Sequence, residues 1–111
     1  MNPVFLSVVI PAFNEETNIR LGALDKVSRY LERQSYVWEV IIVDDGSSDA
    51  TTELLGSFAQ NNPGFTIIHN RHQGKAATVI SGVRASRGEF VLFSDLDQTR
   101  LLVFVLPYYL A

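Results

Sequence analysis

The chain has 111 residues, 12 acidic and 9 basic, so its net charge is −3, and 47% of its residues are hydrophobic. This length and hydrophobic content suit one folded domain and exclude a polar disordered chain. The absence of cysteine excludes disulfides and thiolate metal sites, and the mild negative charge argues against a nucleic-acid-binding protein.

Short runs of β-favouring residues recur along the chain at residues 6–10, 40–43, 65–69 and 90–94. Each run is almost continuous in apolar residues and does not alternate between apolar and polar. Continuous apolar runs are typical of strands that are covered on both faces of a parallel sheet.

Helical patterns lie between these runs. Residues 19–31 carry apolar side chains at three- and four-residue steps, with charged residues off the stripe. A second helix is predicted to open at the capping residues 47–49 and to end at 62–64, and a third covers 75–85. Alternating strands and helices predict one α/β domain with a mostly parallel, Rossmann-like sheet and helices on both faces.

The apolar run at residues 101–111 is too short to cross a membrane, because a spanning helix needs about 20 residues. No transmembrane segment is therefore expected in this chain. The first residues also lack the basic and apolar regions of a secretory signal. We expect the chain to be soluble.

Polar residues follow each predicted strand at its carboxyl end, where open α/β sheets bind their ligands. Residues 14–16 are Asn-Glu-Glu, 44–45 are Asp-Asp, 74–75 are Gly-Lys and 95–97 are Asp-Leu-Asp. Because the carboxyl ends of parallel strands meet at one edge, these side chains are expected to converge there. This convergence is the main functional signal in the sequence.

Asp95 and Asp97 are two residues apart. In an extended segment this spacing places both carboxylates on one side, where they can approach one hard cation, Mg²⁺ or Mn²⁺. The alternative is that Asp95 caps the following segment and Asp97 is solvated. Their place at the end of a buried strand, facing another acidic pair, favours the metal site.

The other polar residues at this edge have local alternatives. Asp44 is expected to accept from a nucleobase N–H or a ribose hydroxyl, whereas Asp45 and Asp49 could equally cap the turn. Glu15 could serve a sugar hydroxyl or favour the positive end of the next helix. Lys75 stands at a predicted helix start, where a phosphate binds well.

Two familiar phosphate motifs are absent. Neither a Walker A loop nor a Gly-x-Gly-x-x-Gly motif occurs in the sequence, which weighs against a dinucleotide dehydrogenase. His69 and His72 are expected to bond local backbone and not a metal. Trp38 and Phe58 are expected in the core.

The segments 8–15, 40–49, 74–75 and 87–97 resemble the family 2 glycosyltransferases in order and spacing. The likeness is strongest to the dolichyl-phosphate glucose and mannose synthases and to bacterial polyprenyl-phosphate glycosyltransferases. It covers roughly residues 5–99.

This resemblance implies the donor-binding half of a GT-A fold in residues 1–100, which would hold a nucleotide-diphosphate sugar with a divalent cation. It implies that Asp44 reads the base, and that Asp97 is a more direct metal ligand than Asp95. The site residues matched by position are Pro11, Ala12, Glu15, Asp44, Lys75, Asp95 and Asp97.

The implied reaction transfers a hexose from a nucleotide-diphosphate sugar to a polyprenyl or dolichyl phosphate. UDP-glucose is the favoured donor and GDP-mannose the second choice. The expected location is the cytoplasm or the cytosolic face of a membrane. The catalytic base stays unknown, since the family carries it in a later part. The tail 101–111 departs from the family pattern, so we expect a truncated open reading frame. The resemblance does not decide whether this shorter chain is active. Two alternatives are a nucleotide-sugar-binding module without turnover and a receiver-like phosphoacceptor domain.

Overall fold

The computed structural model describes residues 3–96 and 105–107. Their strands form one sheet in the order β3-β2-β1-β4-β5. Neighbouring strands are parallel except for β5, which runs antiparallel to β4. The strands are β1 (Leu6–Ala12), β2 (Trp38–Asp44), β3 (Phe65–His69), β4 (Phe90–Phe93) and β5 (Val105–Pro107).

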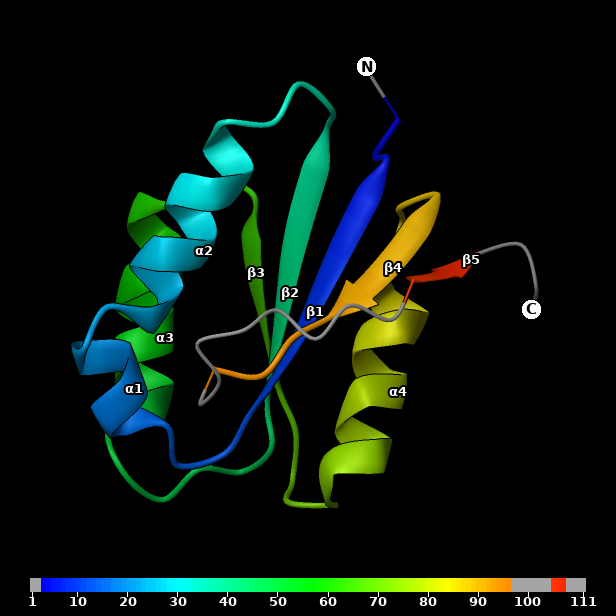
Figure 1. The fold of residues 1–111 in the computed structure, drawn as a ribbon. Coiled ribbons are helices and arrows are strands. Elements are labelled where there is room, and N and C mark those ends of the chain that lie inside the picture. Colours follow the sequence, from blue (N-terminus) through cyan, green and yellow to red (C-terminus); the bar gives the residue numbers. More distant parts are fainter. Residues whose placement is uncertain (1–2, 97–104, 108–111) are drawn as a thin grey trace.

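The predicted strands and the predicted fold class are confirmed. β1 and β2 run further than the apolar runs and end together, because Ala12 pairs with Asp44 in the parallel register. β5 comes from the apolar run at residues 101–111. The carboxyl ends of β1, β2 and β3 therefore lie at one edge of the sheet (Figure 1).

The prediction of a single helix over residues 19–31 is wrong, because the structure has two helices there. The chain forms α1 (Glu16–Arg20) and α2 (Ala23–Glu32), with a break at Leu21 and Gly22. Gly22 has φ of 92°, a left-handed conformation that glycine adopts without steric cost. The apolar stripe runs through this break, so periodicity alone did not reveal it.

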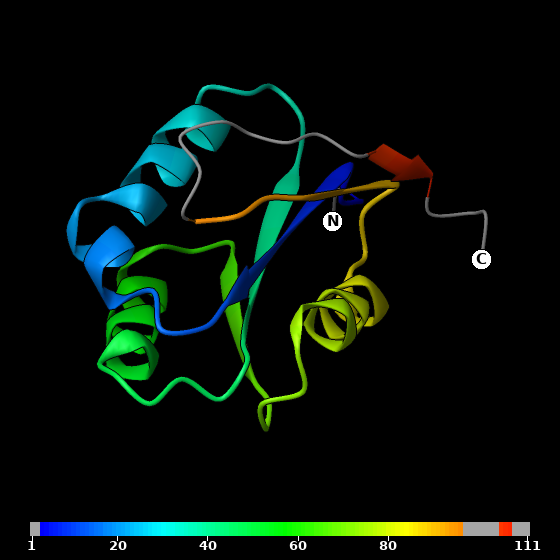
Figure 2. The ribbon, with the colours of Figure 1, turned by 60° about the horizontal axis from the view of Figure 1, so that its bottom comes forward.

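The two later helices are α3 (Thr51–Asn61) and α4 (Lys75–Ala85). α3 begins after residues 47–49, which form a loop instead of the first turn. Asp49 still contributes to the helix start, because its Oδ1 accepts the Thr51 N–H at 2.9 Å. α4 has the predicted bounds. Helices α1, α2 and α3 cover one face of the sheet and α4 covers the other (Figures 1 and 2).

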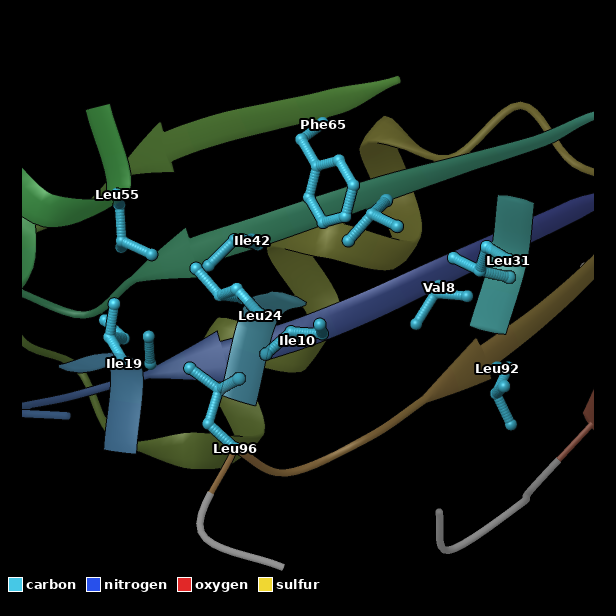
Figure 3. Close-up of a cluster of buried hydrophobic side chains, with 12 residues drawn as sticks. Val8, Ile10, Ile19, Leu24, Leu31, Ile42, Leu55, Phe65, Leu92 and Leu96 are labelled. Carbon is cyan, nitrogen blue, oxygen red and sulfur yellow. The ribbon is translucent and has the colours of Figure 1, made fainter. Parts of the chain in front are cut away.

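The larger hydrophobic cluster lies between the sheet and α1–α3, where Ile10, Leu24 and Leu96 lie together (Figure 3). Trp38 and Phe58 pack against it, as expected. On the other face α4 approaches closely: a Cβ at Gly82 would collide with the Val9 side chain. The glycine allows this close helix-to-sheet approach.

The amino ends of the strands carry a buried polar network that the sequence interpretation missed. Glu39 is 6% exposed and accepts a 2.6 Å hydrogen bond from Ser7 Oγ. It also accepts the Arg87 backbone N–H at 2.7 Å and pairs with the Arg87 guanidinium. Ser7 Oγ in turn accepts the Gly88 N–H at 2.8 Å. These bonds fix the turn between α4 and β4.

Within the residues described, no helix is both long and apolar enough to cross a membrane.

Candidate functional site

A cavity of about 210 Å³ opens at the carboxyl ends of the strands. Its walls come from the end of β1 and the loop after it, the loops after β2 and β3, the start of α4 and the segment after β4. The predicted convergence of polar side chains at this edge is therefore found for Glu15, Asp45, Lys75 and Asp95. The lining residues are Pro11, Phe13, Glu15, Asp45, His72, Gly74, Lys75, Thr78 and Asp95.

Lys75 and Asp95 form an ion pair in this cavity. The Lys75 Nζ lies 2.8 Å from Asp95 Oδ1 and 2.9 Å from Oδ2. Lys75 is placed by the start of α4, whose first residues are held by the Thr78 hydroxyl bonded to the Gly74 carbonyl at 2.7 Å. The side chains are 62% and 24% exposed, respectively, so solvent reaches the pair.

The acidic pair after β2 divides between the two faces of the sheet. Successive side chains of a strand point to opposite faces. Asp44 follows the alternation of Val40 and Ile42, which belong to the cluster beneath α1–α3, whereas Asp45 turns toward α4. As a result Asp45 lines the cavity and Asp44 does not.

Asp45 is 4% exposed and holds the loop that leads into α4. Its carboxylate accepts the Gln73 N–H at 2.8 Å and the Gly74 N–H at 3.0 Å. Burial raises the pKa of Asp45, but these backbone bonds outweigh it and, with Thr78 and His72, hold that pKa below its ordinary value. Asp45 is thus an ionised cap for the loop and also a wall of the cavity.

Asp44 is equally engaged, but on the α3 side. It accepts Thr52 Oγ1 at 2.6 Å and the Ser47 N–H at 3.1 Å, and His69 Nδ1 lies 3.4 Å away. Burial raises the pKa of Asp44, and the bonds from Thr52, Ser47 and His69 lower it further than burial raises it. These contacts hold the loop after β2, and the base-reading role expected for Asp44 stays a prediction.

Asn14 joins the loops after β1 and β2. It adopts φ of 51°, a left-handed conformation that is uncommon outside glycine. Its backbone N–H donates to Ser47 Oγ at 2.9 Å, and its side-chain Oδ1 accepts the Ser48 N–H at 2.8 Å. The two loops are therefore bonded in both directions.

Glu15 follows Asn14 and faces the cavity. Its N–H donates to the buried Thr51 hydroxyl at 2.8 Å, and its Oε1 accepts the Asn18 amide at 2.9 Å. Glu15 precedes α1 directly, so the helix-end role and the ligand role that the sequence left open are compatible in this geometry.

Pro11 lines the cavity, but Ala12 is 1% exposed and belongs to the hydrophobic core. Three lining residues, Phe13, His72 and Thr78, had not been expected at the site. The rings of Phe13 and His72 lie 4.4 Å apart, tilted by 32°. An exposed aromatic directly after a strand end was the available signal for Phe13.

The expectation that the histidines bond local backbone is wrong for His72, because its partner Asp45 lies 27 residues away in the sequence. The His72 Nδ1 lies 3.1 Å from the Asp45 carbonyl oxygen and 2.9 Å from Asp45 Oδ2. His69 contacts a carboxylate, that of Asp44, and not the backbone.

Asp97 lies outside the described residues, so the metal pair can be assessed for Asp95 alone. Among the residues described, no group of three or more His, Asp or Glu could hold a metal ion. Asp95 is nevertheless suited to act as one ligand of a hard cation. Its oxygens face the cavity, and an ammonium already lies against both of them.

The sequence model of glycosyl transferase family 2 matches residues 7–99. The dolichyl-phosphate beta-glucosyltransferase of Saccharomyces cerevisiae is 40% identical over 100 residues, which are 85% of this chain and 30% of that protein. The chain thus spans about 30% of the length of the curated relatives that it matches.

Solved structures share the fold. A mannosyltransferase from Pyrobaculum calidifontis in complex with GDP-Man and Mn²⁺ is 27% identical with a TM-score of 0.71, over 87% of this chain and 30% of that one. Staphylococcus aureus TarS in complex with UDP is 26% identical with a TM-score of 0.71, over 85% of this chain and 28% of that one.

Proposed function

The chain belongs to glycosyl transferase family 2, and from this premise we propose that it forms the donor site of a glycosyltransferase that moves a hexose from a nucleotide-diphosphate sugar to a polyprenyl phosphate. The observation that carries the proposal is the cavity at the carboxyl edge. It gathers an ammonium, three carboxylates and an exposed aromatic ring from four separate segments.

Each part of such a donor has a matching group in the cavity. The ammonium of Lys75, at the amino end of an 11-residue helix, suits a diphosphate, because that end carries partial positive charge. Glu15 offers acceptors to base N–H groups and ribose hydroxyls, while Asp45, whose carboxylate holds the loop before α4, forms part of the wall. Phe13 offers a flat apolar ring to the base. Pro11 forms part of the same wall.

A divalent cation, Mg²⁺ or Mn²⁺, would be held by Asp95 and, by resemblance, Asp97. When bound, it supplies Lewis-acid stabilisation of the departing diphosphate. The acceptor phosphate oxygen attacks the sugar C1, the bond between C1 and the diphosphate oxygen breaks, and the nucleoside diphosphate leaves with that oxygen. Lys75 would neutralise negative charge on that leaving group. The residue that activates the acceptor is not among those identified.

We favour UDP-glucose as donor, followed by GDP-mannose. The matched relatives include dolichyl-phosphate beta-glucosyltransferases from several eukaryotes, which supports glucose and a dolichyl phosphate acceptor. The structural neighbours support both nucleotides, since one was solved with UDP and another with GDP-Man. A lipid-phosphate acceptor would place the reaction at a membrane surface.

Calorimetric titration with UDP, UDP-glucose and GDP, each with and without Mn²⁺, tests the donor site. We expect Mn²⁺-dependent binding of uridine nucleotides, weakened at least about tenfold in Asp95→Asn because a ligand of the cation is lost. Asp25→Asn, an exposed carboxylate on α2, is the matched control and should bind as the unsubstituted chain does. Folded protein that binds none of these nucleotides would contradict the proposal.

A second assay separates transfer from binding. Incubation with radiolabelled UDP-glucose and dolichyl phosphate should give a glucosylated lipid if the chain is competent by itself. Tight nucleotide-sugar binding with no lipid product would instead favour a binding module without turnover.

A further inference from the structure

The ion pair between Lys75 and Asp95 joins two groups that the donor and its cation would each need. Both Asp95 oxygens lie within 2.9 Å of the Lys75 Nζ. An ammonium this close to both oxygens competes with a divalent cation for them, because it occupies one lone pair of each oxygen and repels the second positive charge. The ion pair therefore competes for part of the site that the proposed function requires.

The fold does not depend on this pair. Lys75 is 62% exposed, and ion pairs with such exposure contribute little to stability. A lysine in the first turn of a helix is also unfavourable beside the positive end of the helix dipole. Lys75 in α4 is therefore stabilised by an anion close to it, which in this structure is Asp95.

We propose that Lys75 is an exchangeable counter-ion: it neutralises Asp95 while the cation is absent, and it moves to the donor's diphosphate when a divalent cation takes Asp95. This inference rests on the proposed function. The exchange leaves each charge paired, because Asp95 gains the cation while Lys75 gains the diphosphate. It makes the cation and the nucleotide bind cooperatively, since each favours the position of Lys75 that the other needs.

The inference predicts effects of opposite sign for one substitution. Lys75→Met removes the competing ammonium, so Mn²⁺ alone should bind about fivefold more tightly. This change in affinity corresponds to roughly 1 kcal/mol. The same variant loses a diphosphate contact, so UDP in the presence of saturating Mn²⁺ should bind about tenfold more weakly. If Lys75 only stabilised the fold, or only bound phosphate, its removal would not strengthen the binding of Mn²⁺ alone.

The experiment measures free Mn²⁺ by electron paramagnetic resonance during titration of the chain, and UDP binding by calorimetry. Lys26→Met removes the only other lysine, which is exposed on α2, and corrects for the loss of one positive charge. Lys75→Gln repeats the test with a polar side chain. Urea unfolding of each variant verifies that the fold is retained.

The outcomes distinguish the exchange of Lys75 from the proposed function as a donor site. Tighter Mn²⁺ binding with weaker UDP binding in Lys75→Met, absent from Lys26→Met, supports the exchange. Unchanged or weaker Mn²⁺ binding in Lys75→Met overturns it, even if the unsubstituted chain binds UDP with Mn²⁺. Tighter Mn²⁺ binding with unchanged UDP binding overturns the movement of Lys75 to the diphosphate. No binding of UDP with Mn²⁺ by the folded, unsubstituted chain overturns the proposed function itself.

Discussion

The two ends of the parallel sheet both contain buried carboxylates, and they use them differently. At the amino end, Glu39 is bonded to Ser7 and to the backbone and guanidinium of Arg87. At the carboxyl end, Asp45 accepts two backbone N–H groups and so holds a loop. Beside it the Lys75 and Asp95 side chains stay partly exposed in a cavity.

The comparison shows that a buried carboxylate does not by itself mark a functional site. At the amino end the carboxylate closes the turn between α4 and β4. At the carboxyl end it fixes a loop whose neighbours present charges to solvent. The convergence of charged side chains from separate segments on one cavity distinguishes the candidate site from the structural network. Exposure does not, because the Arg87 side chain beside Glu39 is 72% exposed.

The largest effect is expected at the amino end, from Gly88→Ala. A Cβ there would lie 2.6 Å from both the backbone nitrogen and Oγ of Ser7. Because a backbone atom cannot move aside cheaply, we expect a loss of about 3 kcal/mol in unfolding free energy. Urea unfolding measures it. Gly56→Ala in α3, where nothing lies within 4 Å, should instead stabilise by about 0.5–1 kcal/mol; equal effects would contradict the account.

Next in size is Glu39→Ala, which leaves the buried Ser7 hydroxyl and the Arg87 N–H without their acceptor. We expect a cost of about 2–3 kcal/mol in urea unfolding, because unsatisfied buried donors lose their water bonds as well. Glu53→Ala, on the exposed side of α3, should change stability by less than about 0.5 kcal/mol. A Glu39→Ala chain as stable as the Glu53 variant would show that the network contributes nothing.

The carboxyl end should show a distinct dependence on pH. The pKa values of Asp44 and Asp45 are lower in the folded chain than their ordinary value, so both bind protons more readily when unfolded. Their contribution is complete above about pH 4, near the ordinary carboxyl pKa, and is lost as pH falls through the lower folded values.

Asp45→Asn tests this dependence. We expect it to cost about 2 kcal/mol at pH 7, since charge-assisted bonds to Gln73 and Gly74 are weakened, and progressively less toward pH 3. Urea unfolding at a series of pH values gives the difference between the two chains. A cost that did not shrink in acid would mean that the charge of Asp45 is irrelevant to stability.

The smallest effect sharpens the account of the loops. Asn14→Ala should cost about 1–2 kcal/mol, because alanine is strained at φ of 51° and the bond from the Ser48 N–H is lost. Asn14→Gly loses the same bond without the strain and should cost less in the same thermal or urea unfolding. If the glycine variant were the less stable of the two, left-handed strain at residue 14 would be excluded.

Much of the fold could be predicted because strands that are covered on both faces consist of continuous apolar residues, as at residues 40–43. The break at Gly22 could not be predicted, since the apolar stripe continues across it. The Glu39 network was missed for a different reason. Its partners lie 32 and 48 residues away in the sequence, and no local pattern joins them.

The sequence predicted which edge of the sheet carries the candidate site. It did not predict which of two neighbouring aspartates points into the cavity. Lys75 and Asp95 were expected at this edge and are found there. The choice between Asp44 and Asp45 depends on which face of the sheet each side chain points to, and a difference of one residue reverses that face. Ala12 likewise points into the core and not into the cavity.

The central claim is that a nucleotide and a divalent cation bind at the carboxyl edge. Backbone amide NMR of the ¹⁵N-labelled chain with UDP and a trace of Mn²⁺ tests it most directly, because Mn²⁺ broadens the signals of nearby amides. We predict loss of signal for residues 13–15, 72–75 and 95, while Ser7, Glu39 and Gly88 stay sharp. Broadening centred on the amino edge, or no UDP-dependent broadening of the folded chain, would contradict the claim.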